Sequence, residues 1–354
     1  MHGGDIYRNK IEVDYSINVN PLACPLSVKD AIKKAADHIE IYPDPQYEKL
    51  YKALEERLKV SRDSLLLLNG ASEFISLIVH SRNCKKGLLL APSFIGYKRA
   101  LDSIAADISY FMLDEKDDFL LTEENNIKLC EKISKERPDI VFITNPNNPN
   151  GGLIERKKML KIAKASEEAG SILVIDECFL DLNKKSSDYT MLGFINDFND
   201  LAILNAYTKT YGVAGLRLGY AAVSKSLKDI KKSLPEWNIS TMAYEAGLCI
   251  EEDNNGEISK YLDKSLNLIE EERQYLTKSL AEIKGIEPFL SETNYILFKT
   301  KIDLYKILLK KMILIRDCSD YEGLNKGFYR IAVKTHEENE KLMGVLKEIY
   351  GKFI

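Results

Sequence analysis

One lysine in the sequence is placed where it could act as a reactive amine. Lys209 lies between Tyr207 and Tyr211, and Arg217 follows it in a glycine-containing segment. A lysine amine can act as nucleophile or base, and a nearby guanidinium binds phosphate or carboxylate groups. The segment therefore indicates a covalent or proton-transfer site beside an anion site. A lysine exposed on the surface would fit the same spacing, so the other segments are needed to distinguish a reactive lysine from a surface lysine.

Polar residues also follow two short apolar runs. Asp176 comes directly after Ile172–Ile175, and a turn rich in asparagine and proline, which includes Asn148, follows Ile140–Ile143. A carboxylate at a buried strand end is costly unless it meets a cation. A turn stiffened by proline can hold an asparagine amide in one orientation toward a ligand oxygen. These residues could bind a charged ligand, although an internal salt bridge would also satisfy Asp176.

Two further segments suit an anionic or planar ligand. Ala71 and Ser72 follow the run Leu65–Leu68 and begin a mostly apolar helical stretch, where free backbone N–H groups can bind an anion. Phe94 follows Leu88–Leu90 and could stack on a flat ligand. A plain helix cap at Ser72 and a packed side chain at Phe94 are the alternatives. Neither G-x-G-x-x-G nor a P-loop motif is present, which argues against dinucleotide and P-loop sites.

The elements that must position these residues alternate between short apolar runs and amphipathic segments. Nearly all-apolar runs are typical of strands buried on both faces of a parallel sheet. These runs are Leu65–Leu68, Leu88–Leu90, Ile140–Ile143, Ile172–Ile175, Leu201–Leu204 and Leu218–Val223. Segments between them, such as Lys157–Ala169, have helical spacing. The alternation predicts an α/β fold with a mostly parallel sheet, whose ligands bind at the carboxyl ends of the strands.

After about Pro235 the pattern changes to a smaller α+β unit. A long charged amphipathic stretch, Gly256–Ile283, precedes short segments with strand character. These strands are expected at Asn294–Lys299, Ile313–Arg316 and Phe328–Val333, and helices at Leu26–His38, Leu304–Lys311 and Glu337–Tyr350. We expect an N-terminal arm that contributes to the small domain (residues 1–40), a large domain (41–235), and a connecting helix with the small domain (236–354).

Composition and charge exclude several classes of protein. The 354 residues include 50 Lys plus Arg and 54 Asp plus Glu, a near-neutral balance that lacks the basic excess of a nucleic-acid binder. No apolar run approaches the ~20 residues of a membrane-spanning helix, and the start lacks a signal-peptide profile, so we predict no membrane association and a cytoplasmic location. The six cysteines and four histidines are scattered without ligand spacing, which predicts reduced thiols and no metal site.

Taken together and in order, these segments resemble the class I/II aminotransferase family of fold type I pyridoxal-phosphate (PLP) enzymes. The motifs run G-A-S-E, P-S-F, N-P-N-N-P-N-G, D-E-x-F and T-K-x-x-x-x-x-G-L-R-L-G-Y, and the resemblance covers nearly the whole chain. It implies a large domain with a mostly parallel sheet of the seven-stranded type and a smaller α+β domain. It also implies PLP as cofactor.

The resemblance assigns roles to four residues around the cofactor ring. Lys209 would form the Schiff base with the cofactor aldehyde and later act as base or acid at the substrate carbon. Asp176 would pair with the pyridine nitrogen and keep it protonated, which preserves the ring as an electron sink. Asn148 would donate to the phenolic oxygen, and Phe94 would stack on the ring.

The resemblance also assigns the residues that hold the cofactor phosphate. They would be the backbone of Ala71 and Ser72, the hydroxyl of Thr208, and Arg217. Tyr42 matches a tyrosine that reaches the phosphate in the neighbouring subunit, which implies a homodimer with shared active sites.

For the substrate, Arg330 matches the arginine that binds a carboxylate in a bidentate fork. Both substrate classes considered below carry a phosphate, so a second anion pocket is needed. The candidates are Arg316, Asn20 and, from the arm, His2 and Arg8.

Three positions depart from the common family pattern. Phe179 stands where many members have a tyrosine, Ala206 where a serine or threonine is common, and Asn150 where N-P-T-G has threonine. None removes a group essential for Schiff-base chemistry, but together they make ordinary transamination doubtful.

Two branches of the family share most of these motifs. Threonine-phosphate decarboxylases of cobamide synthesis additionally resemble the chain at His2–Gly4, at Asp14–Pro21, at Ile315–Ser319 and at Phe179. We therefore favour decarboxylation of L-threonine O-3-phosphate. Histidinol-phosphate aminotransferase, or a related amino-acid aminotransferase, is the alternative. A DNA-binding regulator with this fold is a third, but no basic helix-turn-helix precedes the arm in this sequence.

Overall fold

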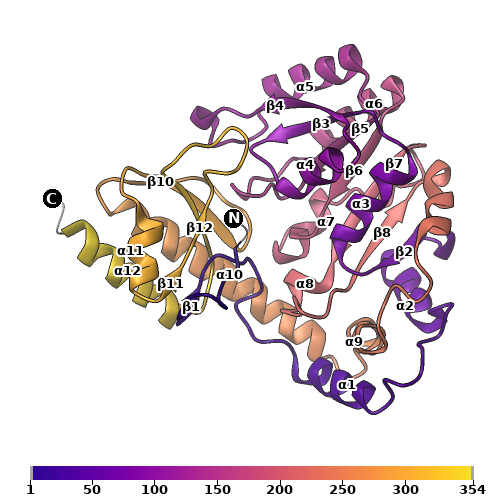
Figure 1. Cartoon of the computed structure of the whole chain (residues 1–354), viewed down its shortest axis with the longest axis horizontal. Helices are drawn as coiled ribbons and strands as arrows, with labels where there is room; N and C mark the ends of the chain where they lie inside the picture. Colours follow the sequence, from indigo (N-terminus) through magenta and orange to yellow (C-terminus); the bar gives the residue numbers. More distant parts are fainter. Residues whose placement is uncertain (1–2, 352–354) are drawn as a thin grey trace.

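A computed structural model of the chain describes residues 3–351, and its largest element is a seven-stranded sheet (Figure 1). The strand order is β2-β8-β7-β6-β5-β3-β4. The strands are β2 (Leu65–Leu68), β3 (Lys86–Ala91), β4 (Asp107–Met112), β5 (Ile140–Thr144), β6 (Ile172–Asp176), β7 (Leu201–Ala206) and β8 (Gly219–Val223). All neighbouring pairs are parallel except the two that involve β8. The predicted α/β class with a mostly parallel sheet is confirmed.

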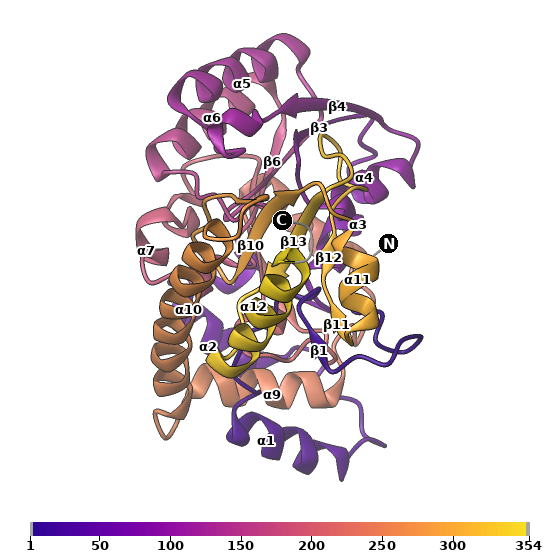
Figure 2. The same ribbon diagram turned by 90° about the vertical axis from the view of Figure 1, so that its left-hand side faces the viewer.

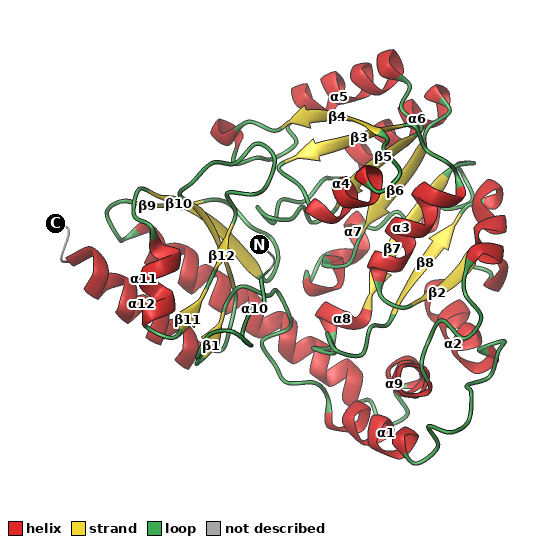
Figure 3. Cartoon of the chain, in the orientation of Figure 1, coloured by secondary structure: helices red, strands yellow, loops and turns green. Residues whose placement is uncertain are grey.

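Most strands of this sheet are buried on both faces, as their apolar sequences predict. In β2, Leu65 and Leu67 belong to the core on one face, and Leu66 and Leu68 belong to the core on the other. Helices α2, α5, α6 and α9 contribute to the first core, and α3 and α4 to the second. The bounds are α2 (Glu48–Leu58), α3 (Ala71–Ser81), α4 (Ile95–Asp102), α5 (Glu123–Glu136), α6 (Arg156–Ala169) and α9 (Thr241–Glu252). The sheet is therefore a middle layer between two layers of helices (Figure 3).

A four-stranded antiparallel sheet forms the smaller unit beside the large sheet. Its order is β12-β13-β10-β9, from β9 (Ile286–Pro288), β10 (Tyr295–Thr300), β12 (Arg316–Asp317) and β13 (Phe328–Ala332). Helices α10 (Glu257–Ala281), α11 (Leu304–Lys310) and α12 (His336–Gly351) share a separate core with one face of this sheet (Figure 2). The other face carries Arg330 and is turned toward the large sheet.

The N-terminal segment contacts both units. β1 (Val13–Asp14) pairs in parallel with β11 (Ile313–Leu314), next to the small sheet. Further along, α1 (Leu26–Ala36) lies against α9 (Figure 1). The arm thus crosses from the small unit to the large one, and the division at residues 40 and 235 stays a prediction.

Two further α-helices are short, α7 (Ser186–Tyr189) and α8 (Tyr207–Thr210). α8 follows β7 directly, so it begins at the carboxyl edge of the large sheet. Among residues 3–351, no helix is long and apolar enough to cross a membrane.

Candidate active site

A cavity of about 350 Å³ lies between the carboxyl edge of the large sheet and the small sheet. Its wall brings together most of the residues that the sequence predicted for the cofactor and the substrate. These are Ala71, Ser72, Phe94, Asn148, Asp176, Thr208, Lys209, Arg217, Arg316 and Arg330. Those of the large domain lie there because the carboxyl ends of parallel strands meet at one edge of a sheet, whereas Arg316 and Arg330 come from the antiparallel small sheet.

Lys209 projects into this cavity from α8. Its amine is buried, and burial together with the positive charges of Arg330 and Arg217 lowers the pKa of the lysine to about 8. The Nζ atom lies 5.8 Å from the centre of the Phe179 ring. A lysine with this pKa exists partly as the free amine near neutral pH, which suits a nucleophile or a proton-transfer group.

Asp176 ends β6, and both of its carboxylate oxygens are fixed. Oδ2 accepts a hydrogen bond from the Tyr97 hydroxyl at 2.7 Å, and Oδ1 accepts one from the backbone N–H of Cys178 at 3.0 Å. Burial raises the pKa of the carboxyl group above its usual value. An ionised carboxylate here would be stabilised by a cation in the cavity, as a protonated ring nitrogen would provide.

Tyr97 is a site residue that the sequence analysis missed. It is fully buried on α4, its ring stacks on Phe142 with centroids 4.8 Å apart, and its hydroxyl also hydrogen-bonds Thr144 Oγ1 at 2.8 Å. Phe94 directly precedes α4 and Tyr97 lies in its first turn, with the two rings edge-on and their centroids 5.4 Å apart, so the short distance in sequence from Phe94 is the signal that could have revealed Tyr97.

Asn148 and Arg330 are linked to each other. Asn148 Oδ1 accepts a hydrogen bond from the Arg330 guanidinium, and another from the Tyr321 hydroxyl at 3.3 Å. Arg330 also donates to the backbone oxygen of Ser16 at 3.0 Å, while its Nε is buried without a hydrogen bond among the described residues. Because the oxygen of Asn148 is taken, its NH₂ group is the part that can donate to a ligand.

The residues predicted to hold the cofactor phosphate form a cup at the start of α3. Arg217 donates to Ser72 Oγ at 3.0 Å, and the guanidinium passes over Gly70, where an added Cβ would lie 2.5 Å from Arg217 Nη2. The Thr208 hydroxyl is buried without a partner among residues 3–351. An unpartnered hydroxyl, a guanidinium and a helix N-terminus together fit a phosphate group.

The opposite wall carries two arginines in adjacent strands. Arg316 in β12 and Arg330 in β13 are directly paired in the antiparallel register, so both side chains lie on the same face of the small sheet. Both are buried, and Arg316 forms an ion pair of 2.7 Å with Asp320.

The arm supplies the rest of that wall. Gly3, Ser16, Ile17 and Asn18 line the cavity, and the backbone N–H of Gly4 donates to Ser16 Oγ at 2.7 Å. A Cβ on Gly3 would lie 2.4 Å from the backbone oxygen of Ser16, so only glycine permits this close approach. Asn18, like Tyr97, was missed; its Oδ1 is buried without a hydrogen bond among the described residues.

The structure does not place Asn20, a predicted substrate-binding residue, among the residues that line the cavity. Its amide nitrogen donates to the backbone oxygen of Thr210 at 2.7 Å and to Ser265 Oγ at 2.8 Å, and its Oδ1 accepts from Leu22 N–H. All of its polar groups are used within the protein, so none is available to a substrate.

Three other predicted residues also lie away from the cavity or outside the description. Arg8 is exposed and pairs with Asp5 at 3.2 Å. Tyr42 is 74% exposed and stacks on Trp237 with ring centroids 4.5 Å apart. His2 lies outside the described residues.

Of the three residues that depart from the family pattern, two line the cavity and one does not. Phe179 and Ala206 line the cavity with apolar atoms, and Phe179 packs edge-on against Tyr295. Asn150 is buried, accepts a hydrogen bond from Asn147 and donates to the backbone oxygen of Phe119. Asn150 therefore stabilises the loop and does not reach the cavity.

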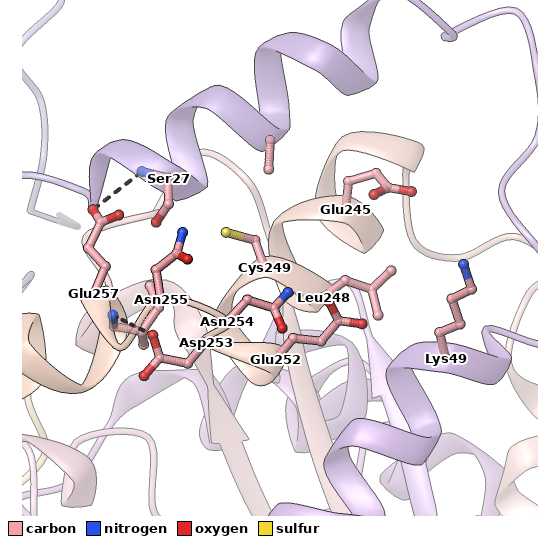
Figure 4. A pocket seen from close by; sticks show the side chains of 12 residues that line it. Ser27, Lys49, Glu245, Leu248, Cys249, Glu252, Asp253, Asn254, Asn255 and Glu257 are labelled. Carbon is pink, nitrogen blue, oxygen red and sulfur yellow. Dashed lines mark hydrogen bonds between the residues drawn. The ribbon is translucent and has the colours of Figure 1, made fainter.

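A second cavity of about 350 Å³ lies between α1, α2, α9 and the start of α10 (Figure 4). Its carboxylates serve the surrounding helices: Glu257 accepts from the backbone of Leu26 and Ser27, and Asp253 accepts from Ile258 and Ser259 at the start of α10. We assign it no chemistry, because these acidic groups satisfy helix N-termini. In the described part of the chain, no group of three His, Cys, Asp or Glu side chains is arranged to hold a metal ion.

Comparisons with known proteins agree with the geometry of the site. A sequence model of the family described as aminotransferase class I and II matches residues 10–346. The chain is 30% identical to threonine-phosphate decarboxylase of Salmonella typhimurium, over 95% of this chain and 91% of that protein. It is 33% identical to histidinol-phosphate aminotransferase of a Thermoanaerobacter species, over 97% and 93% of the two chains. The crystal structure of histidinol-phosphate aminotransferase from Clostridium acetobutylicum superposes with a TM-score of 0.87, at 32% identity and covering 96% of this chain and 100% of that one.

Proposed function

Because the chain belongs to the class I and II aminotransferase family, whose enzymes use pyridoxal phosphate, we propose that it releases CO₂ from a phosphorylated amino acid. The substrate that fits the site best is L-threonine O-3-phosphate. Site roles for individual residues form part of this proposal.

The pairing of Arg316 with Arg330 carries the proposal. Lys209, Arg217, Arg316 and Arg330 are the basic residues of the cavity wall, and Asp176 is the one acidic residue among the described residues that line it. If Arg217 binds the cofactor phosphate, Arg316, which also pairs with Asp320, and Arg330 are the guanidinium groups of the wall that would contact the substrate. A substrate with both a carboxylate and a phosphate would use both of them.

Histidinol-phosphate aminotransferase is the second candidate, and the comparisons support it as well. The relative with that activity in its name is 33% identical to the chain, against 30% for the decarboxylase, and covers a similar share of it. Histidinol phosphate carries a phosphate but no carboxylate, so with it only one of the two arginines could contact an anionic group of the substrate, whereas threonine phosphate offers an anionic group to each. This difference in charge is the reason that we place the decarboxylase first.

The residues of the large-sheet wall would prepare the cofactor. Bound pyridoxal phosphate supplies an aldehyde for the substrate amine and a ring that accepts electrons from the bond broken at Cα. Asp176, held by Tyr97 and Cys178, would keep a proton on the ring nitrogen. Asn148 would donate from its NH₂ group to the phenolic oxygen, and Phe94 would cover one face of the ring.

The residues of the small-sheet wall would set which bond breaks. Only the Cα bond perpendicular to the ring plane can pass its electrons to the ring. Arg330 would bind the substrate carboxylate, while Arg316 and Asn18 would bind the distal phosphate. Two anchors fix the torsion at Cα, so binding energy from the remote phosphate would determine the reaction as well as the affinity. Lys209 would then deliver a proton to Cα after CO₂ has left.

We also propose that two copies of the chain form a homodimer with shared active sites. Ile39, Ile41, Tyr42 and Trp237 form an apolar surface around a groove that also includes Ile239 and Met242. Large apolar side chains gathered on a surface are typical of protein interfaces. Light scattering on the purified protein tests this proposal: a mass of twice 40.3 kDa supports it, and a monomer at micromolar concentration contradicts it.

The reaction is tested by incubating the purified protein with L-threonine O-3-phosphate, with and without 2-oxoglutarate, while CO₂ and glutamate are measured. We expect CO₂ and 1-amino-2-propanol O-phosphate without any keto acid. L-Threonine, which lacks the distal anchor, should react far more slowly. Formation of glutamate from histidinol phosphate and 2-oxoglutarate, with no CO₂ from threonine phosphate, would establish the second candidate instead.

A further inference from the structure

The helix that carries Lys209 is too short to hold its own position. α8 has four residues, and its own hydrogen bond joins the Tyr211 N–H to the Tyr207 oxygen at 3.1 Å. A single helical turn is unstable in isolation because several backbone torsions are fixed for one hydrogen bond. The position of the Lys209 backbone must therefore depend on contacts from outside the turn.

One set of contacts begins at Tyr207, the first residue of α8. Its buried hydroxyl donates to Glu251 Oε1 at 2.6 Å. Glu251 lies on α9 with a fully buried side chain, and both its oxygens accept from Arg57 on α2, at 2.6 and 3.0 Å. The bidentate pair fixes the acceptor that holds Tyr207, because two parallel hydrogen bonds restrict the carboxylate in angle as well as distance.

The surroundings of this pair are also ordered. The Arg57 guanidinium lies 5.5 Å from the centre of the Tyr220 ring, and the Tyr220 ring meets Tyr207 edge-on with centroids 6.0 Å apart. Just before α8, Asn205 donates to Asp181 Oδ2 at 3.2 Å. None of these residues lines the cavity around Lys209, so their contacts act on the site indirectly, and those of Tyr207 act through the turn that carries Lys209.

The other end of α8 is held by the arm. The backbone N–H of Asn20 donates to the Lys209 oxygen at 2.9 Å, and its side-chain amide donates to the Thr210 oxygen. The turn is thus fixed at its start by α9 and α2 and at its end by the arm. A displacement of either end would move the Lys209 backbone relative to Asp176.

We propose that Tyr207, held by the Glu251–Arg57 pair, is a positioning residue that sets the location of the Lys209 amine for proton transfer. This inference rests on the proposed role of Lys209. Tyr207 touches neither substrate nor cofactor in this arrangement. Its effect on the reaction would pass through the backbone of α8.

The test compares Tyr207→Phe with Tyr211→Phe in the holoenzyme. Tyr211 is a buried tyrosine of the same turn, its ring lies 5.8 Å from that of Tyr207, and its hydroxyl makes no hydrogen bond to the described residues. Three quantities are measured: kcat, KM, and the midpoint of the pH titration of the absorbance of the lysine-bound cofactor. A displacement of ~1 Å can cost on the order of 100-fold in rate, so loss of one anchor should lower kcat about tenfold. KM should stay within about twofold, and the titration midpoint should move, whereas Tyr211→Phe should leave all three unchanged.

Glu251→Gln provides a second variant in case Tyr207→Phe folds poorly. This variant keeps an acceptor for the Tyr207 hydroxyl but removes the negative charge that holds the acceptor against Arg57. It should therefore lower kcat and shift the titration midpoint in the same direction as Tyr207→Phe, by smaller amounts. A lowered melting temperature with unchanged kcat and midpoint in both variants overturns the inference and leaves a purely structural role. If Lys209→Ala retains turnover, the proposed function itself is wrong. That result is distinct from a failure of the inference about Tyr207, in which Lys209 remains essential and the Tyr207 variant behaves like the parent.

Discussion

The two walls of the cavity are built in different ways. On the large-sheet wall, Asp176 is the last residue of the buried strand β6 and Lys209 comes shortly after the buried strand β7, so local sequence determines their position. On the small-sheet wall, Arg316 and Arg330 are brought together by antiparallel pairing, and Asn18 and Gly3 arrive from the far end of the chain. The first wall depends on neighbours in sequence, and the second depends on contacts between distant segments.

This difference in construction corresponds to a difference in the proposed functions of the two walls. The large-sheet wall carries the groups proposed to bind the cofactor, and these would be needed for any substrate. The small-sheet wall carries the groups proposed to select the substrate. Substitutions on the first wall should therefore affect every reaction of the protein, and substitutions on the second should depend on which substrate is offered.

Lys209→Ala should have the largest effect. Loss of a positioned acid or base typically costs on the order of 100-fold to 10,000-fold in rate, and the covalent link to the cofactor would also be lost. Borohydride treatment followed by peptide mapping checks this: the parent should carry reduced cofactor on Lys209 and the variant on no lysine. Cofactor fixed at a different lysine of the parent would disprove the assignment.

Asp176→Asn should have the next largest effect, because the ring nitrogen would face a neutral partner. Loss of a charge-assisted hydrogen bond of ~1.5–3 kcal/mol corresponds to roughly a tenfold to hundredfold lower kcat. Tyr97→Phe removes one of the two hydrogen bonds to the same carboxylate and should cost less. Steady-state rates with threonine phosphate measure both, and an Asp176→Asn variant as fast as the parent would remove this residue from the mechanism.

Arg316→Gln tests the second wall. We expect kcat/KM for L-threonine O-3-phosphate to fall about tenfold, through the loss of a charged hydrogen bond to the phosphate. The rate with L-threonine, which has no phosphate, should change little. Equal losses with both substrates would contradict the separation between the walls.

Glu177→Gln should have the smallest effect, and on stability alone. Glu177 follows Asp176 but points away from the cavity, where its carboxylate accepts from Thr190 Oγ1 and from the Met191 N–H. Burial raises the pKa of its carboxyl group from 4.5 to about 7. The folded protein therefore holds a proton that the unfolded chain releases, and this contribution to stability is present below pH 4.5 and lost as the pH rises to about 7.

Glutamine carries no titratable proton, so the variant should lack this loss of stability with rising pH. Relative to the parent, its free energy of unfolding should rise by on the order of 3 kcal/mol between pH 4.5 and pH 8. Urea unfolding at several pH values measures the difference, with Glu168→Gln on the exposed side of α6 as the matched control. A parent and variant with parallel pH profiles would show that Glu177 ionises normally.

The predictability of the two walls follows the same division. The sequence placed Asp176, Asn148 and Lys209 at the cavity because short apolar runs mark buried strands and the next residues lie at the sheet edge. It selected Asn20 and missed Asn18, since the side of the arm that faces the cavity is decided by contacts with β11, β13 and α8. These contacts join residues that are distant in sequence, so no local sequence pattern predicts them.

Two elements of the fold show the same limit. The edge strand β4 was not expected, because its half-exposed sequence Asp107–Met112 mixes polar and apolar residues and lacks an all-apolar run. The single strand expected at Ile313–Arg316 is divided into β11 and β12, which pair with different partners. Pairing partners distant in sequence are decided by the assembled fold.

The division at Ile315 limits how this part of the protein can change in length. The chain leaves its pairing with β1 at Leu314 and enters its pairing with β13 at Arg316. Successive side chains of a strand point to opposite faces, so adding or deleting one residue here would turn Arg316 away from Arg330 or break the contact with the arm. If Arg316 binds the substrate as proposed, substrate choice can be altered in this segment by exchanging side chains, whereas a change in length by a single residue would disrupt the wall.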